Sequence, residues 1–177
     1  MRLPRYHNSH DRLQAVLINT SGGLTGGDDM CLKIDIGEKA KVSFTTQACE
    51  KFYKSTETEF CHIDNELNIA ANASALWLPQ ESILFRNSHV RRKLRVNLAK
   101  NAQVMLAETL IFGRSSSGEI YDKGRLHDDW DITYDGQLIH SERLRINGEN
   151  PLMNSSAGLS GHKALSTLVL IGGALEH

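Results

Sequence analysis

A short pattern of apolar residues recurs four times along this chain, and it constrains the fold more than any other feature. In each copy, apolar and polar side chains alternate, a turn follows, and a second alternating stretch comes after the turn. The copies begin at Leu32, Leu67, Leu94 and Ile132, and the last has its turn shortened to Asp135-Gly136. Alternation with a period of two is typical of a β-strand with one buried face.

Two strands joined by a turn cannot bury their apolar side chains alone, so repeats of such a unit stack on one another. We therefore predict a mainly β fold, a β-helix-like stack of repeated two-strand units with few helices. The alternation also predicts the inward rows that form the core: Leu32, Ile34, Val42, Phe44, Trp77, Leu94, Val96 and Leu106.

The length of 177 residues suits one domain, predicted to span 1–174 and to be truncated at its C-terminus. Residues 175–177 read as the remnant of an expression tag. A net charge of −1 gives no electrostatic reason to expect nucleic acid or a membrane as partner. The three cysteines show no framework spacing, which favours the reducing cytoplasm as location.

Two glycine-rich segments resemble enzyme motifs without matching them. The spacing of Gly22 and Gly27 is that of a phosphate-binding loop, but the next residue is Asp28 where such a loop needs lysine. A tight turn with positive φ is the favoured interpretation. The segment 113–118 has serine at position 117, where a nucleophile elbow needs glycine, so we expect a surface loop.

Candidate metal ligands are present but do not cluster. His7 and His10 are the only closely spaced histidines, and they lie near a terminus with no helical pattern to align their rings. Glu108 and Glu142 occupy the same position in copies three and four, so stacking would bring them close together on one face. They are weak candidates for an internal polar lane, because a lone glutamate usually faces solvent. We predict no resident metal or cofactor, and we interpret the basic run 91–95 as a solvated strand face.

Four sequence blocks carry a more specific signal: residues 17–28, 45–55, 77–85 and 113–119. In order and spacing they resemble the family of the urease accessory protein UreD, also called UreH. The resemblance implies that the motif residues form partner-binding loops. These residues are Gly22, Gly23, Gly26, Gly27, Asp28, Thr46, Gln47, Lys51, Tyr53, Pro79, Gln80, Glu81, Gly113, Arg114, Gly118 and Glu119.

The resemblance further implies a non-catalytic scaffold or chaperone of the cytoplasm. Such a protein binds apo-urease subunits with UreF, and through the complex the GTPase UreG, and assists nickel insertion into the urease active site. Family members have a β-helix-like fold and are associated with transient nickel passage through an interior tunnel. A homodimer within the complex is left open.

Two alternatives remain at this point. One is a small metal-dependent hydrolase on a β scaffold, using Asp28, Glu81, Glu119 and His127. The other is a β-helical binding module without any involvement of metal. Metal analysis of the pure protein would distinguish the hydrolase from the scaffold.

Overall fold

The structure is a computed structural model that describes residues 12–56, 59–114, 118–150 and 154–172. These residues form strands and no α-helix, so none of them belongs to a helix that could cross a membrane. The strands are β1 Leu13–Leu17, β2 Asp29–Ile36, β3 Lys41–Thr46, β4 Glu50–Phe52, β5 Cys61–Ile69, β6 Ser74–Trp77, β7 Ser82–Leu84, β8 His89–Leu98, β9 Gln103–Phe112, β10 Arg125–Tyr134, β11 Gln137–Asn147 and β12 Ala164–Ile171.

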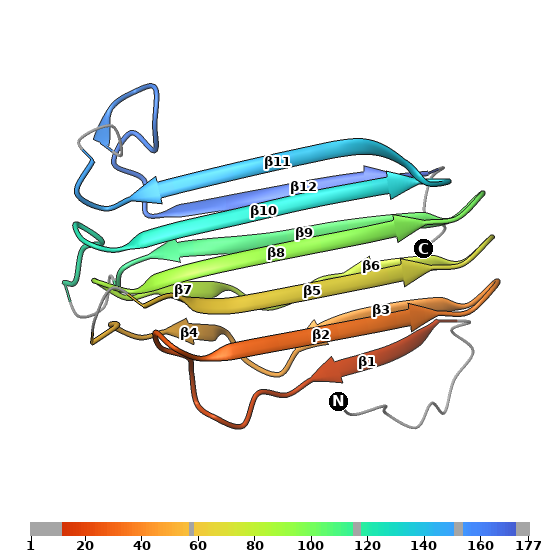
Figure 1. Ribbon diagram of the computed structural model, residues 1–177, viewed down its shortest axis with the longest axis horizontal. Coiled ribbons are helices and arrows are strands. Elements are labelled where there is room, and N and C mark those ends of the chain that lie inside the picture. Colours follow the sequence, from red (N-terminus) through yellow and green to blue (C-terminus); the bar gives the residue numbers. More distant parts are fainter. Residues whose placement is uncertain (1–11, 57–58, 115–117, 151–153, 173–177) are drawn as a thin grey trace.

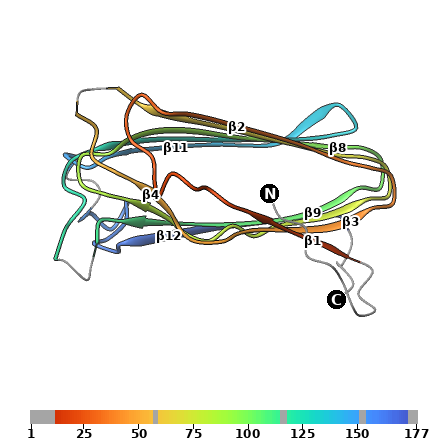
Figure 2. The same cartoon turned by 90° about the horizontal axis from the view of Figure 1, so that it is seen from below.

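The strands are arranged as a β-solenoid of about four turns, which confirms the predicted stack of two-strand units. Two sheets face each other across the core (Figure 2). One has the order β1-β3-β6-β9-β7-β4 with β12 also paired to β9, and the other has the order β11-β10-β8-β5-β2. We call them the long-path sheet and the five-stranded sheet. Successive turns of the solenoid pair in parallel within each sheet.

Short turns carry the chain from one sheet to the other at a single end of the solenoid, on the right in Figure 1. In the first three copies, the third turn residue has positive φ: 59° at Lys39, 59° at Asn72 and 60° at Asn101. The residue after each turn donates a backbone hydrogen bond to the residue that opens it. This left-handed residue lets the chain reverse within three residues, and asparagine adopts it more readily than most side chains.

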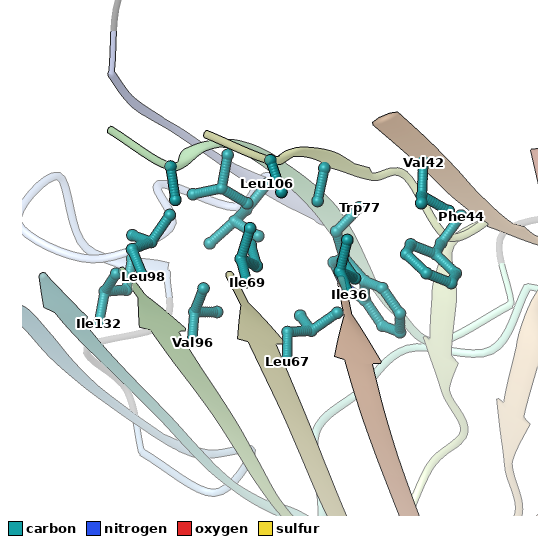
Figure 3. Packing of buried hydrophobic residues seen from close by; sticks show 14 of the residues in the cluster. Ile36, Val42, Phe44, Leu67, Ile69, Trp77, Val96, Leu98, Leu106 and Ile132 are labelled. Carbon is teal, nitrogen blue, oxygen red and sulfur yellow. The ribbon is translucent and has the colours of Figure 1, made fainter. Parts of the chain in front are cut away.

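The register of the strands brings equivalent residues of the repeat into one row. Ile34, Leu67, Val96 and Ile132 are successive partners in the five-stranded sheet. Across the core, Phe44 pairs with Trp77 and Trp77 with Leu106. These rows interlock in the buried cluster of Figure 3. The predicted core residues are all found there, with Leu32 and Ile34 packed against it and only partly buried. Burial of such stacked apolar rows is the main stabilising term of the fold.

Among the three return strands that lie in the long-path sheet, that of the third copy, β9, runs unbroken. The return strand of the first copy is broken into β3 and β4, and that of the second copy into β6 and β7. The β9 strand pairs with both β6 and β7. Pro79 lies in the break between β6 and β7, where a proline cannot donate to a β ladder. Glu50–Phe52 form the short strand β4, which pairs with β7 beyond the break.

The fourth copy differs from the others because its turn is shorter. Asp135 and Gly136 both have positive φ, 49° and 78°, as in a two-residue type I′ hairpin turn. Such a turn reverses the chain within one sheet, so β11 pairs antiparallel with β10 and does not cross to the opposite sheet. The β12 strand supplies the next layer of the long-path sheet instead.

Candidate functional site

The four motif blocks meet at the end of the solenoid opposite the short turns, where longer connections lie (left in Figure 1). The turn after β1 contacts β4 and the residue that follows it through two backbone hydrogen bonds: Leu24 N to Lys51 O at 2.8 Å and Tyr53 N to Leu24 O at 2.7 Å. Gly113 N donates to Leu84 O at 2.8 Å, which joins the third and fourth blocks. The structure therefore brings the motif segments together, while their role in partner binding remains a prediction.

Glycine at position 23 leaves room for Tyr53 and for the backbone of β4. It has φ +145°, and a Cβ at this position would collide with the Tyr53 ring and lie 2.9 Å from Lys51 O. The Tyr53 hydroxyl donates to Gly22 O at 3.2 Å, and Asp28 Oδ2 accepts from Thr25 N at 2.8 Å. These contacts confirm a tight glycine turn with positive φ, and they explain Asp28 as a turn-stabilising carboxylate.

An aromatic and ionic cluster continues from this turn. The Tyr53 ring meets the Phe85 ring edge-on, with centroids 5.0 Å apart, and the Arg114 guanidinium lies 4.5 Å from the Phe85 centroid. Glu119 accepts two hydrogen bonds from Arg114 and one from the backbone N of Arg86. Desolvation by burial raises the pKa of Glu119, but hydrogen bonds from Arg114 and from the backbone of Arg86 outweigh it, so this pKa lies below its ordinary value. Aromatic and arginine side chains held in fixed positions are typical anchors of protein interfaces.

A cavity of about 500 Å³ begins beside this cluster and leads into the space between the sheets. Its rim is exposed and comes from the residues after β1 and between β3 and β4, and its inner end is buried. Seven predicted motif residues line it: Gly22, Gly23, Thr46, Gln47, Lys51, Pro79 and Gln80. Thr46 fixes part of this wall, because its Oγ1 accepts from Gln80 N at 2.9 Å.

The inner end of the cavity holds a buried ionic group that joins both sheets. Arg92 from β8 donates to Glu108 of β9 at 2.6 Å and to Asp128 of β10 at 2.8 and 3.2 Å. Its Nη1 donates to Ser82 Oγ at 2.9 Å, and Trp77 Nε1 donates to the other Glu108 oxygen at 2.7 Å. Buried charges need such partners, since an isolated one is costly to desolvate.

The charge balance of this group is negative. Arg92, Glu108 and Asp128 are each no more than 8% exposed, and their formal charges are one positive and two negative. Burial lowers the pKa of Arg92, but the two carboxylates outweigh it and raise this pKa above its ordinary value. The guanidinium therefore stays charged, and the formal charge of the three side chains together is −1.

Three predictions about charged residues need correction. Glu108 and Glu142 do not share a face, because Glu108 lies in β9 and Glu142 lies in β11 of the opposite sheet. Glu108 is buried, so the interpretation as an exposed carboxylate is wrong for it. The run 91–95 is not wholly solvated either, since Arg92 points inward while its neighbours Arg91 and Lys93 are not buried.

The residues of the hydrolase alternative do not form a common site. Asp28 and Glu119 are engaged in the turn and in the Arg114 cluster, while His127 packs against Phe60 at 5.1 Å between centroids. The backbone oxygen of Glu81 accepts a hydrogen bond from Glu50 N at 2.9 Å. Among residues 12–56, 59–114, 118–150 and 154–172, no three His, Cys, Asp or Glu side chains are grouped to hold a metal. The pair His7 and His10 lies outside the described residues.

The comparisons with known proteins agree with the resemblance that the four motif blocks carry. The model of the UreD urease accessory protein family matches residues 1–177. The urease accessory protein UreD of Chelativorans sp. (strain BNC1) is 42% identical over 172 residues, covering 97% of this chain and 61% of the relative. That of Rhizobium johnstonii is 41% identical over 165 residues, covering 93% and 60%. That of Sinorhizobium medicae is 40% identical over 172 residues, covering 97% and 61%.

The chain thus spans about 60% of the length of the curated relatives it matches. The family match extends over the whole chain and includes all four motif blocks. The chain belongs to the UreD urease accessory protein family.

Proposed function

We propose that this protein is a non-catalytic urease maturation factor. It binds apo-urease subunits together with UreF and, through the complex, the GTPase UreG, and it assists nickel insertion into urease in the cytoplasm. Family membership supports the assignment, since the relatives are named for a role accessory to urease. The reduced state of Cys31, Cys49 and Cys61 suits that compartment.

The cavity is the single observation that carries the proposal. It connects an exposed rim of motif residues to buried carboxylates inside a rigid solenoid. Carboxylate oxygens are common ligands for divalent cations. Nickel is the cargo of this process. The carboxylates of Glu108 and Asp128, together with the polar residues that line the cavity, give nickel a route between the sheets.

The loop cluster of Tyr53, Phe85 and Arg114 supplies the docking surface in this proposal. Its rings and guanidinium are held by mutual contacts, so little side-chain entropy is lost on binding a partner. The docking surface and the mouth of the cavity then lie next to each other. Gly22 and Gly23 line the cavity and also form the turn that contacts Tyr53.

Co-expression tests the proposal. The protein in its full natural length is expressed with urease subunits and UreF, and tagged UreF is purified. The expected result is co-purification of all components, together with loss of urease activation when the gene is deleted. Failure to co-purify with either partner, with unchanged activation in the deletion strain, would overturn the proposal.

A further inference from the structure

The buried ionic group presents both oxygen ligands and a competitor for them. Glu108 and Asp128 approach each other from different sheets and are bridged by one guanidinium group, that of Arg92. One Glu108 oxygen is further held by Trp77, and the remaining Nη atom of Arg92 is held by Ser82. The oxygens that face the arginine are therefore occupied by a cation that belongs to the chain itself.

A guanidinium cannot leave such a position by losing a proton, because arginine stays charged in proteins. It can release the carboxylates only by breaking its hydrogen bonds and turning away. An incoming divalent cation must therefore displace Arg92 to gain two carboxylate ligands. The residual negative charge of the group attracts that cation, but the cost of displacement limits how tightly it is held.

We propose that Arg92 is a resident counter-cation that competes with a divalent cation for Glu108 and Asp128, so that the cavity lets the cation pass and does not retain it. This inference rests on the proposed function and adds a regulating residue to the same cavity. In this proposal, Arg92 is a positioning residue that sets how tightly the cavity binds the divalent cation.

One further feature fits this role. Asn65 lines the same cavity, and its buried Oδ1 has no hydrogen-bond partner in the part of the chain that the structure describes. This amide oxygen can coordinate a passing cation. Because the amide is neutral, it adds no negative charge that would hold the cation in the cavity.

The test compares nickel binding by matched variants of the full-length protein. Arg92→Met keeps much of the side-chain length and removes the competing charge. Arg95→Met is the control, since Arg95 lies on the same strand and pairs with Asp64 and Glu66 on the outer face. Equilibrium dialysis against Ni²⁺ measures the dissociation constant, and circular dichroism confirms that each variant is folded.

We expect Arg92→Met to hold one Ni²⁺ per chain roughly tenfold more tightly than the unmodified protein, because ligand charge tunes cation affinity. Arg95→Met should leave the affinity unchanged. The double variant Arg92→Met with Asp128→Asn should lose the gain, which a merely structural effect of Arg92 does not predict. A folded Arg92→Met protein with unchanged nickel affinity would overturn the inference, as would an equal gain in Arg95→Met.

Arg92→Lys provides a second test in case Arg92→Met does not fold. Lysine keeps the charge but cannot make the bidentate contact, so it leaves one carboxylate less occupied. We expect Arg92→Lys to bind Ni²⁺ about threefold more tightly than the unmodified protein, which places its affinity between those of the unmodified protein and Arg92→Met. No gain in folded Arg92→Lys contradicts the inference. The proposed function is judged separately by co-purification, which does not depend on nickel affinity.

Discussion

Trp77 donates a 2.7 Å hydrogen bond from its indole nitrogen to Glu108, and both side chains are almost completely buried. The two residues lie on β6 and β9 of the long-path sheet, and Glu108 is also bound by Arg92 from the opposite sheet. This pair therefore ties the apolar core to the inner end of the cavity.

Trp77→Phe should destabilise the protein while preserving most of the core packing. The substitution removes the donor to one oxygen of a buried carboxylate, which costs about 1–3 kcal/mol. Urea denaturation monitored by circular dichroism measures the free energy of unfolding. Phe44→Leu, a change in the same apolar row without a polar partner, serves as the control for lost ring volume. Equal free energy of unfolding in Trp77→Phe and the unmodified protein would show that the hydrogen bond contributes nothing.

Gly23→Val should displace Tyr53 and weaken the motif turn. The new Cβ would collide with the Tyr53 ring, and valine is strained at the φ of this position. Backbone strain of this kind costs about 1–3 kcal/mol, in addition to the collision. We expect a lower melting temperature and reduced urease activation. Gly37→Ala is the control, because a Cβ there meets no atom within 4 Å. Normal activation by Gly23→Val would count against the importance of this turn.

Arg114→Ala should reduce co-purification with the urease complex more than it reduces stability. The guanidinium lies over Phe85 and binds Glu119 in an exposed cluster, so its loss removes an interface anchor. We expect at least about a fivefold loss of captured partner, equivalent to roughly 1 kcal/mol of binding. Arg143→Ala is the control, since Arg143 makes similar ion pairs with Asp131 on the outer face of the five-stranded sheet. A similar loss in both variants would argue against a specific docking cluster.

Stability should fall at alkaline pH because of Cys61. Burial, followed by the negative charges of Asp28, Glu50 and Asp29, raises the pKa of Cys61 from 9.0 to about 12. The folded state holds this proton more tightly than the unfolded state. The contribution of the Cys61 thiol to the free energy of unfolding is therefore fully present below pH 9.0, and it is lost as the pH rises toward about 12.

The slope of this loss is at most about 1.4 kcal/mol per pH unit for one group. The raised pKa of Tyr121 also lowers the free energy of unfolding, but only from pH 10.0 upward. Between pH 9 and pH 10 the loss of stability therefore reports on the Cys61 thiol. Urea denaturation at successive pH values measures the slope, and Cys61→Ala should remove it in that interval. An unchanged slope in Cys61→Ala would assign the alkaline loss to other groups.

The fold could be predicted from the sequence because its repeat encodes the strand register directly. The period of two fixes which residues point inward, and the repeat fixes which rows stack, as the row from Ile34 to Ile132 shows. The same rule would have identified the buried ionic group. Arg92, Glu108 and Asp128 each have the inward parity of their strand, shared with Leu94, Leu106 and Trp130.

What the sequence could not provide was the pairing between the sheets. Arg92 meets Glu108 across the core, and no local pattern states which inward side chains of two facing sheets lie opposite each other. The error for Glu142 has a local cause that could be recognised. The Asp135-Gly136 turn reverses the chain within one sheet, so the fourth copy could not place Glu142 beside Glu108.

The nickel content of urease tests the central claim most directly. Ala48 is exposed on the rim of the cavity, and Ala48→Trp fills the mouth without altering the core. Urease is purified after co-expression with the full-length variant, and bound nickel is measured by atomic absorption, with Lys100→Trp at the turn end of the solenoid as control. We predict a several-fold loss of nickel per urease active site in Ala48→Trp, with co-purification retained, and normal nickel in Lys100→Trp. Full nickel loading by a folded Ala48→Trp protein would contradict a route through this cavity.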